Sequence, residues 1–210
     1  MCKLSFIHTD KIINDTCMCG LLKCSAYCPA KYADQWVTLE EKDNLAPYLG
    51  SSWEVIDNVF DMCNISYDSK VLDLGAGDGR VLIRAVQRGA RLAVGYELNK
   101  SVYELGRSQV KAFDNIELIN GDCRSIKNIS NFNVITLFLL PEGLKMIEPF
   151  LSANLHDNND VTTTTTTTTT TTVVSLGWPI PNWPITKKEI SEFGTLIYVY
   201  KRHFTEASAI

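Results

Sequence analysis

The stretch Val71-Leu-Asp-Leu-Gly-Ala-Gly-Asp-Gly-Arg80 decides the fold of this chain. It begins within a short apolar strand, Lys70–Leu74, and continues into three glycines at alternate positions. Glycine has no Cβ, so such a run lets the backbone turn sharply and approach a ligand closely. The apolar pattern that follows predicts a helix to about Arg88, with Gly89 as its stop. A strand, a glycine turn and a helix in this order are typical of a ligand-binding α/β unit.

The alternation of strands and helices continues along the chain. Strands are predicted at Leu92–Tyr96, Ile116–Ile119, Asn133–Leu140 and Val173–Leu176, and helices at Ser51–Cys63, Lys100–Phe113 and Glu142–Leu155. Such alternation indicates a parallel sheet with right-handed crossovers. The last strand, Thr195–Lys201, alternates between two faces, which suits an antiparallel edge and leaves the C-terminal part of the sheet short. The predicted fold class is therefore α/β, a doubly wound, mostly parallel Rossmann-like sheet with an antiparallel C-terminal strand.

The length of 210 residues predicts a single folded domain. Residues 1–43 show no sustained period and are expected to form an irregular or partly helical N-terminal extension. The domain is expected to cover residues 44–204, with a tail at 205–210. Within it, residues 156–172 are a polar, threonine-rich low-complexity insertion. Because threonine has a high β-propensity, the last threonines can extend the fifth strand backward.

Composition excludes several classes of protein. The net charge of −4 does not indicate a nucleic-acid partner. The seven cysteines are odd in number and follow no secretory signal, which predicts free thiols in a reducing compartment. Four of them, between Cys17 and Cys28, lack the paired C-x2-C spacing of zinc folds, so no metal is expected and zinc is the alternative. No apolar stretch reaches the roughly 20 residues that span a bilayer.

The glycine spacing indicates which ligand binds. Read from Gly75, the last glycine of the dinucleotide fingerprint G-x-G-x-x-G is replaced by Arg80. Asp73 stands two residues before the first glycine. S-adenosylmethionine has no pyrophosphate, but its amino group and sulfonium favour nearby carboxylates and carbonyls. The motif therefore fits S-adenosylmethionine better than NAD, and a nicotinamide oxidoreductase is the alternative.

Two further acids are expected beside Asp73. Glu97 ends the second strand and can accept hydrogen bonds from both ribose hydroxyls, while Asp122 follows the third strand and can meet the adenine amino group. Each acid alone could be a cap or turn residue, but three in register across three strands favour a cofactor site. The predicted cofactor-binding residues are Asp73, Leu74, Gly75, Ala76, Gly77, Asp78, Gly79, Glu97, Leu98, Asp122 and Cys123.

These residues resemble a known family. The runs Asp73–Val81, Arg88–Ala90 and Ala93–Asn99 resemble class I S-adenosylmethionine-dependent methyltransferases. More narrowly, Tyr96-Glu-Leu98 followed by Asn99 is similar to the small lysine N-methyltransferases that modify mitochondrial adenine nucleotide translocase and the ATP synthase c subunit.

Two segments outside the cofactor motif extend the resemblance to about Ala46–Tyr200. Pro47-Tyr-Leu-Gly-Ser51 resembles the family's aromatic segment upstream of the first strand, with Gly50 where proline is usual. Trp178-Pro-Ile-Pro-Asn-Trp183 resembles the aromatic–proline segment after the fifth strand. The tripeptide Leu139-Leu-Pro141 stands where methyltransferases of base amines carry Asn-Pro-Pro-aromatic, which argues against a DNA-adenine substrate.

The resemblance implies methyl transfer to a lysine amine of a protein, with a mitochondrial membrane protein among the candidates. It implies a mitochondrial location, or a cytoplasmic one if residues 1–43 are not a targeting signal. A lysine must lose its proton before it reacts, and an apolar, aromatic mouth lowers its pKa by desolvation. The predicted mouth residues are Tyr48, Leu140, Pro141, Trp178 and Trp183, although edge packing is the alternative for the tryptophans. The alternatives for function are methylation of a small molecule or RNA, and a catalytically silent binding scaffold.

Overall fold

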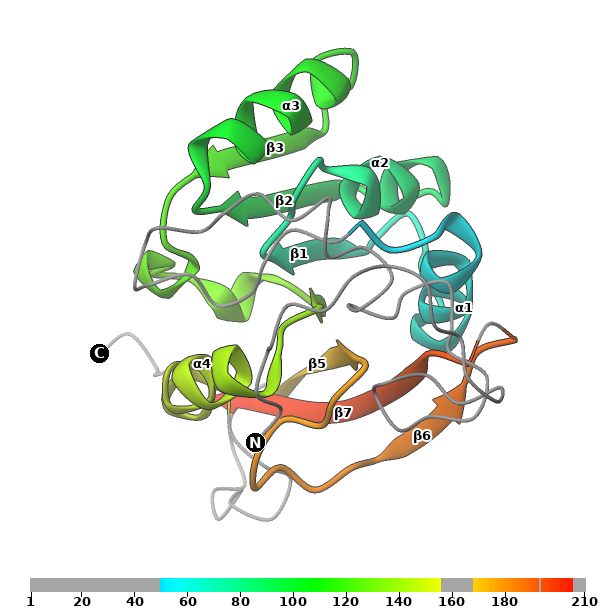
Figure 1. The fold of residues 1–210 in the computed structure, drawn as a ribbon. Coiled ribbons are helices and arrows are strands. Elements are labelled where there is room, and N and C mark those ends of the chain that lie inside the picture. The colour runs from blue at the N-terminus through cyan, green and yellow to red at the C-terminus, as the bar shows by residue number, and fades with distance from the viewer. Residues whose placement is uncertain (1–49, 156–167, 193, 206–210) are drawn as a thin grey trace, which may run out of the picture.

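A computed structural model describes residues 50–155, 168–192 and 194–205 (Figure 1). The helices are α1 (Trp53–Cys63), α2 (Arg80–Gln87), α3 (Lys100–Val110) and α4 (Pro141–Asn154), with short 3-10 turns η3 (Cys123–Ser125) and η4 (Ile129–Asn131). The strands are β1 (Lys70–Leu74), β2 (Leu92–Glu97), β3 (Ile116–Asn120), β4 (Val134–Leu137), β5 (Thr168–Leu176), β6 (Lys187–Ile190) and β7 (Leu196–Thr205). The predictions for residues 1–43, for Tyr48 and for the cysteines between Cys17 and Cys28 lie outside the described residues.

The described strands form one sheet in the order β3-β2-β1-β4-β5-β7-β6. All neighbours pair in parallel except β7, which is antiparallel to β5 and to β6. The predicted doubly wound, mostly parallel fold is confirmed. The strand order reverses direction between β1 and β4, and ligands of open α/β sheets bind at the carboxyl ends of the strands at such a reversal.

The C-terminal part of the sheet differs from the prediction in one respect. The antiparallel strand was expected at the edge, but β7 lies between β5 and β6, and β6 is the edge strand. All four residues of β6 are exposed, Lys187, Lys188, Glu189 and Ile190. A strand without a buried face has no alternating pattern, so hydrophobic periodicity could not reveal it.

The connection from β5 to β6 contains no helix. Residues 177–186 form an irregular segment with a turn at Pro181–Asn182, and Ile180 and Trp183 from it are buried in the core. Pro179 and Pro181 both lack an amide hydrogen and fix φ, which is incompatible with a helix interior. The two prolines therefore explain why this crossover is not helical.

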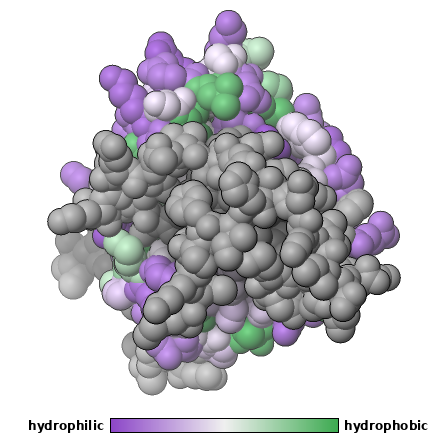
Figure 2. All heavy atoms as spheres, in the orientation of Figure 1, coloured by the Kyte–Doolittle hydropathy of each residue, from purple (hydrophilic) through white to green (hydrophobic). Residues whose placement is uncertain are grey.

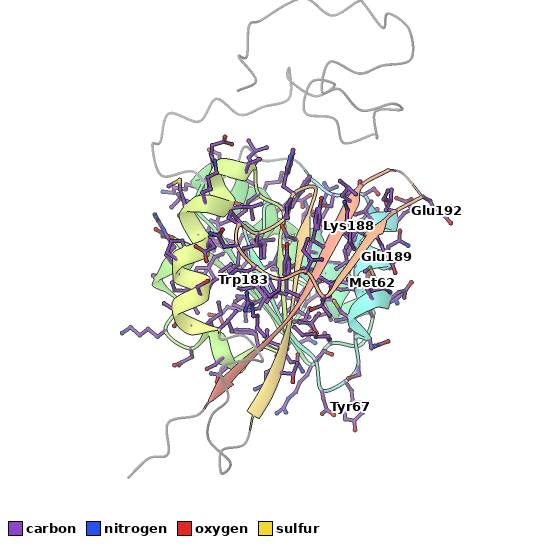
Figure 3. All side chains as sticks on the ribbon, turned by 90° about the horizontal axis from the view of Figure 1, so that it is seen from below. Met62, Tyr67, Trp183, Lys188, Glu189 and Glu192 are labelled. Atoms are coloured by element: carbon purple, nitrogen blue, oxygen red, sulfur yellow. The ribbon has the colours of Figure 1, made fainter. Side chains whose placement is uncertain are left out.

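The helices cover both faces of the sheet. Figure 3 shows α1 and α4 on opposite sides of the strands. On the α1 side, Val71 of β1 packs with Phe60 and with Leu82 of α2. On the α4 side, Leu72 and Leu74 pack with Leu144, Ile147 and Leu151. Burial on both faces accounts for the continuous apolar runs by which the central strands were recognised.

Helices α1 and α3 begin, and α2 ends, at residues of the usual capping types. Ser52 Oγ accepts from the amide of Val55 at 3.3 Å and begins α1, and Asn99 caps α3 through the amides of Ser101 and Val102. Gly89 follows α2 with φ of +95°, a left-handed conformation that favours glycine.

The outer surface over α3 is mostly hydrophilic (Figure 2).

The end of the threonine run belongs to β5, as predicted. Thr168–Thr172 pair with β7, and only Thr172 among them also pairs with β4. Thr171 and Thr172 are buried, and Thr171 Oγ1 donates to the carbonyl of Phe132 at 2.8 Å. The rest of the insertion, residues 156–167, lies outside the described residues. The proposed domain limits stay predictions.

Candidate cofactor and substrate site

The glycine loop after β1 has the backbone that its sequence predicts. Gly75, Gly77 and Gly79 have φ of +91°, +57° and +79°, in the left-handed region where a Cβ is strained. The amides of Gly75 and Ala76 donate to the carbonyl of Tyr96 at 3.0 and 2.9 Å. These two bonds fold the loop back over the end of β2, so its shape is set by hydrogen bonds as well as by glycine.

Two more glycines let neighbouring elements approach this loop. A Cβ at Gly106 of α3 would lie 2.8 Å from the carbonyl oxygen of Gly77, and one at Gly95 of β2 would lie 2.5 Å from Ala76 Cβ. The sequence prediction missed both residues. A signal was present, since an isolated glycine inside a helix or strand usually marks a close approach of backbones.

Glu97 is joined to the glycine loop. Its Oε2 accepts from the amide of Gly77 at 2.9 Å, and its Oε1 accepts from the amide of Asn99 at 2.8 Å. Burial raises the pKa of the Glu97 carboxyl, and the backbone donors of Asn99, Gly77 and Leu98 oppose that rise. Each carboxylate oxygen has a second lone pair. The predicted pairing with two ribose hydroxyls is compatible with these bonds and stays a prediction.

Asp73 is a buried acid at the centre of the site. It is only 5% exposed, and burial raises its pKa to about 7, although the Thr136 hydroxyl that donates to Asp73 Oδ1 at 2.7 Å lowers it. The nearby carboxylates of Glu97 and Asp78 raise it further. Within the described ranges no lysine or arginine forms an ion pair with Asp73. A buried acid of this kind fits a ligand that brings its own positive charge, as S-adenosylmethionine does.

Asp78 has a charged partner within the protein, and its predicted contact with the cofactor stays a prediction. It is 4% exposed, and both of its oxygens accept from the guanidinium of Arg80, at 2.9 Å to Nε and 2.7 Å to Nη2. This bidentate pair neutralises the carboxylate within the loop. Asp78 therefore shapes the loop, and its charge is already balanced by a protein side chain.

Asp122 lies on the turn after β3, next to the end of β2, where the amide of Gly121 donates to the carbonyl of Glu97. Both of its oxygens accept from Arg124, which holds the pKa of Asp122 below its usual range. The neighbouring Cys123 is buried in the core, and burial raises the pKa of its thiol to about 12. The structure brings Asp122 to the predicted edge of the sheet, and its contact with adenine stays a prediction.

The predicted mouth begins at the end of β4. A Cβ at Gly75 would lie 3.5 Å from Leu139 Cδ2, so this turn faces the glycine loop. Leu140 is the N-cap of α4 and Pro141 its first residue, and both are partly exposed. Trp178 is close by in the fold, since it follows Gly177, whose Cβ would lie 3.4 Å from Phe138 Cε2. The loop, Leu140 and Trp178 thus follow the carboxyl ends of the neighbouring parallel strands β1, β4 and β5.

Trp183 lies elsewhere. It is 6% exposed, its Nε1 donates to Ser152 Oγ at 2.8 Å, and the Arg202 guanidinium carbon lies 3.8 Å from its ring centre. Ser152 comes eleven residues after Pro141 in α4, which is about 16 Å along a helix. Figure 3 shows Trp183 beside α4 and within the fold. The structure therefore separates Trp183 from the mouth and favours the packing alternative.

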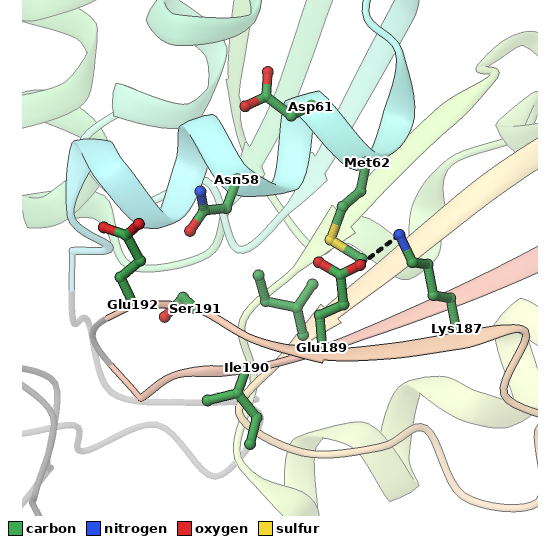
Figure 4. A pocket seen from close by; sticks show the side chains of 9 residues that line it. Asn58, Asp61, Met62, Lys187, Glu189, Ile190, Ser191 and Glu192 are labelled. Carbon is green, nitrogen blue, oxygen red and sulfur yellow. Dashed lines mark ion pairs between the residues drawn. The ribbon is translucent and has the colours of Figure 1, made fainter.

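A groove between α1 and β6 is a distinct feature (Figure 4). Its lining residues are Asn58, Asp61, Met62, Lys187, Glu189, Ile190, Ser191, Glu192 and Ile197. Lys187 and Glu189, both of β6, form an ion pair on one side of this groove. No residue of the glycine loop or of the mouth lines this groove, so it is not part of the candidate site.

Neither a membrane-spanning helix nor a metal-binding cluster is found among the residues that the structure describes. None of the described helices is both long and apolar enough to cross a bilayer. No group of three or more histidine, cysteine or acidic side chains in the described ranges is arranged to hold a metal ion.

Comparison with known proteins identifies the kind of domain. Residues 73–187 match the family described as the ANTKMT methyltransferase domain. The chain is 31% identical over 145 residues to the mouse adenine nucleotide translocase lysine N-methyltransferase, which covers 65% of this chain and 55% of that protein. It is also 31% identical over 118 residues to a protein-lysine N-methyltransferase of Saccharolobus islandicus, covering 52% of this chain and 70% of the relative. The chain thus spans little more than half the length of the mouse relative.

A solved structure supports the fold and the cofactor. An RNA methyltransferase from Salinibacter ruber in complex with S-adenosyl-L-homocysteine superimposes with a TM-score of 0.62 and 27% identity, over 73% of this chain and 93% of that one. The prediction of S-adenosylmethionine as cofactor is confirmed at the level of the family.

Proposed function

This chain belongs to the ANTKMT methyltransferase domain family, and we propose that it transfers a methyl group from S-adenosylmethionine to the side-chain amine of a lysine in a protein. The observation that carries the proposal is the meeting of the glycine loop, Glu97 and the Leu139–Pro141 turn at the reversal of strand order. The lysine preference is supported by the protein-lysine methyltransferases to which the chain is similar.

The cofactor's place is proposed from the contacts of the loop. Bound S-adenosylmethionine would supply an electrophilic methyl group to the neutral nitrogen of the lysine. Asp73 would face the positive charge of the cofactor, since it is buried and without a cationic partner among the described residues. Glu97 would hold the ribose while its backbone bonds keep the loop in place.

The substrate lysine is proposed to enter between Leu140, Pro141 and Trp178. These side chains are partly exposed and apolar, which favours the neutral amine over the ammonium and so prepares the nitrogen for attack. The aromatic ring of Trp178 would also attract the methylated, cationic product. Tyr48, which lies outside the described residues, is proposed to complete this mouth. A mitochondrial location is proposed from the named targets of the relatives.

The proposal is tested by incubating the full chain with isotope-labelled S-adenosylmethionine and a mitochondrial membrane extract, followed by mass spectrometry. Labelled methyl groups on protein lysines are the expected result, with the variant Glu97→Ala as a control that loses them. Label on RNA or on a small molecule, with no modified lysine, would establish the alternative enzyme class. Tight cofactor binding without any labelled product would indicate a silent scaffold.

A further inference from the structure

Arg80 connects two segments that are far apart in the sequence. It is the first residue of α2, directly after the glycine loop. Its Nε and Nη2 donate to the two oxygens of Asp78 at 2.9 and 2.7 Å, and its Nη1 donates to the carbonyl of Ser51 at 2.9 Å. One guanidinium thus binds both the cofactor loop and the chain that leads into α1.

Gly50 leaves the space in which this guanidinium lies. A Cβ at Gly50 would be 2.4 Å from Arg80 Cζ and 2.6 Å from each Nη. Arginine side chains are flexible and can often move away from such a contact. Here the nitrogens are bonded to Asp78 and Ser51, so any movement away from residue 50 must lengthen or break one of these bonds.

We propose that Arg80 is a positioning residue that ties the chain at Gly50–Ser51 to the cofactor loop at Asp78, and that in this chain the tie depends on the glycine that replaces the family's usual proline at position 50. The inference rests on the proposed function, because the loop is where the cofactor is proposed to bind. The tie fixes Gly50 and Ser51 relative to the cofactor loop. The predicted mouth residue Tyr48 stands two positions before Gly50 in the sequence.

From this arrangement we expect that lysine at position 80 cannot form the tie. A lysine at this position keeps one positive charge for Asp78, whose side chain is almost fully buried. It has no planar fork, however, and cannot donate to Asp78 and Ser51 in the same geometry. Arg80→Lys therefore removes the tie without leaving an unpaired buried carboxylate, and it also frees the space beside residue 50.

The test is a double-mutant cycle with Gly50→Ala and Arg80→Lys, in which the affinity for S-adenosylmethionine is measured by calorimetry well below the melting temperature. Each single variant is expected to bind roughly tenfold more weakly, as for loss of a charged hydrogen bond. The double variant should bind no more weakly than Arg80→Lys alone. The inference would be overturned if the affinity losses of the two single variants multiplied in the double variant. It would also be overturned if Gly50→Ala bound S-adenosylmethionine as tightly as the wild type.

A matched control separates positioning from general stability. Arg84, one turn further along α2, forms a bidentate pair with Asp57 of α1 at 2.7 and 2.5 Å and makes no recorded contact with the loop. Arg84→Lys should lower the melting temperature and leave the affinity for S-adenosylmethionine unchanged.

Hydrogen exchange of the cofactor-free protein distinguishes failure of this inference from failure of the proposed function. In Arg80→Lys the amides of residues 50–56 and 75–80 should exchange faster together. If the wild-type protein does not bind S-adenosylmethionine but this joint change is seen, the tie stands and the proposed function falls. Unchanged exchange at residues 50–56 would refute the tie.

Discussion

Gly106 of α3 lies against Gly77 of the glycine loop so closely that a Cβ at position 106 would be 2.8 Å from the Gly77 carbonyl oxygen. The same Cβ would be 2.8 Å from Leu118 Cδ2, on β3. Helix, loop and sheet therefore meet at a point that has no room for a side chain. The position of the loop depends on this contact as much as on its own glycines.

Gly106→Ala is expected to destabilise the protein, against the usual trend. Within a helix this substitution ordinarily gains about 1 kcal/mol, but overpacking here should lower the free energy of unfolding by about 1–3 kcal/mol. Affinity for S-adenosylmethionine should fall as the loop is displaced. Urea unfolding and calorimetry measure the two effects, with exposed Gln109→Ala of the same helix as control. A more stable Gly106→Ala protein would contradict the prediction.

Glu97→Gln is expected to weaken cofactor binding by about 1.5–3 kcal/mol, the usual range for hydrogen bonds to a charged group. The amide keeps the size of the side chain but turns an NH2 toward the amide of Gly77 or Asn99, both of which are donors. Calorimetry with S-adenosylmethionine measures the loss. Glu104→Gln, on the exposed face of α3, should bind as the wild type does. An unchanged affinity in Glu97→Gln would remove Glu97 from the cofactor site.

The raised pKa of Asp73 predicts that the stability of the protein depends on pH. Its pKa is raised from 3.8 to about 7, so the folded protein holds a proton that the unfolded chain releases near pH 4. The contribution of Asp73 to stability is therefore complete below pH 4 and is lost as the pH rises to about 7. Urea unfolding across this range should show a decline in wild type that is smaller in Asp73→Asn, where Glu97, whose pKa burial also raises, still contributes.

Thr136→Val checks the cause of that pKa. The Thr136 hydroxyl lowers the pKa of Asp73, so its removal should raise the pKa and carry the decline in stability to higher pH. Binding of S-adenosylmethionine, which carries positive charge, should strengthen as Asp73 ionises and should need a higher pH in Thr136→Val. A decline at the same pH in both proteins would mean that another group titrates.

The two tryptophans of the 177–186 crossover should behave differently. Trp183→Ala should lower the free energy of unfolding by about 3–5 kcal/mol, as for truncation of a large buried aromatic, with cofactor affinity unchanged. Trp178→Ala should leave cofactor affinity unchanged and raise KM for the protein substrate. Steady-state kinetics and urea unfolding separate the two. If the milder Trp183→Phe is stable but has a raised KM, Trp183 belongs to the mouth after all.

Much of the fold followed from local patterns. The buried strands β1, β2 and β4 are continuous apolar runs, and the caps Ser52 and Asn99 are of residue types with a known local function. Edge strand β6 was missed because its residues face solvent, and that omission led to the wrong position for β7. A strand held only by pairing with its neighbour carries no hydrophobic signature.

The parts of the site that depend on backbone conformation could be predicted from the sequence. The partners of its charged side chains could not. The three loop glycines have the left-handed conformations that their spacing suggested. The arginine partners of Asp78 and Asp122 stand only two residues away in each case, and these two ion pairs were not foreseen from the sequence. The separation of Trp183 from the mouth depends on the path of residues 177–186, which no local pattern records.

The pairing of Thr168–Thr172 with β7 has a consequence for how this gene can vary. Homopolymeric repeats gain and lose units easily, and most strands would be shifted by such an event. Here Val173–Ser175 align with Ile135–Leu137 of β4, and the threonines before them are identical to one another. Whatever the length of the repeat, the five positions ahead of Val173 remain threonine while at least five copies persist, so the same hydroxyl reaches Phe132. A change in the number of threonines therefore leaves the residues that pair in β5 unchanged.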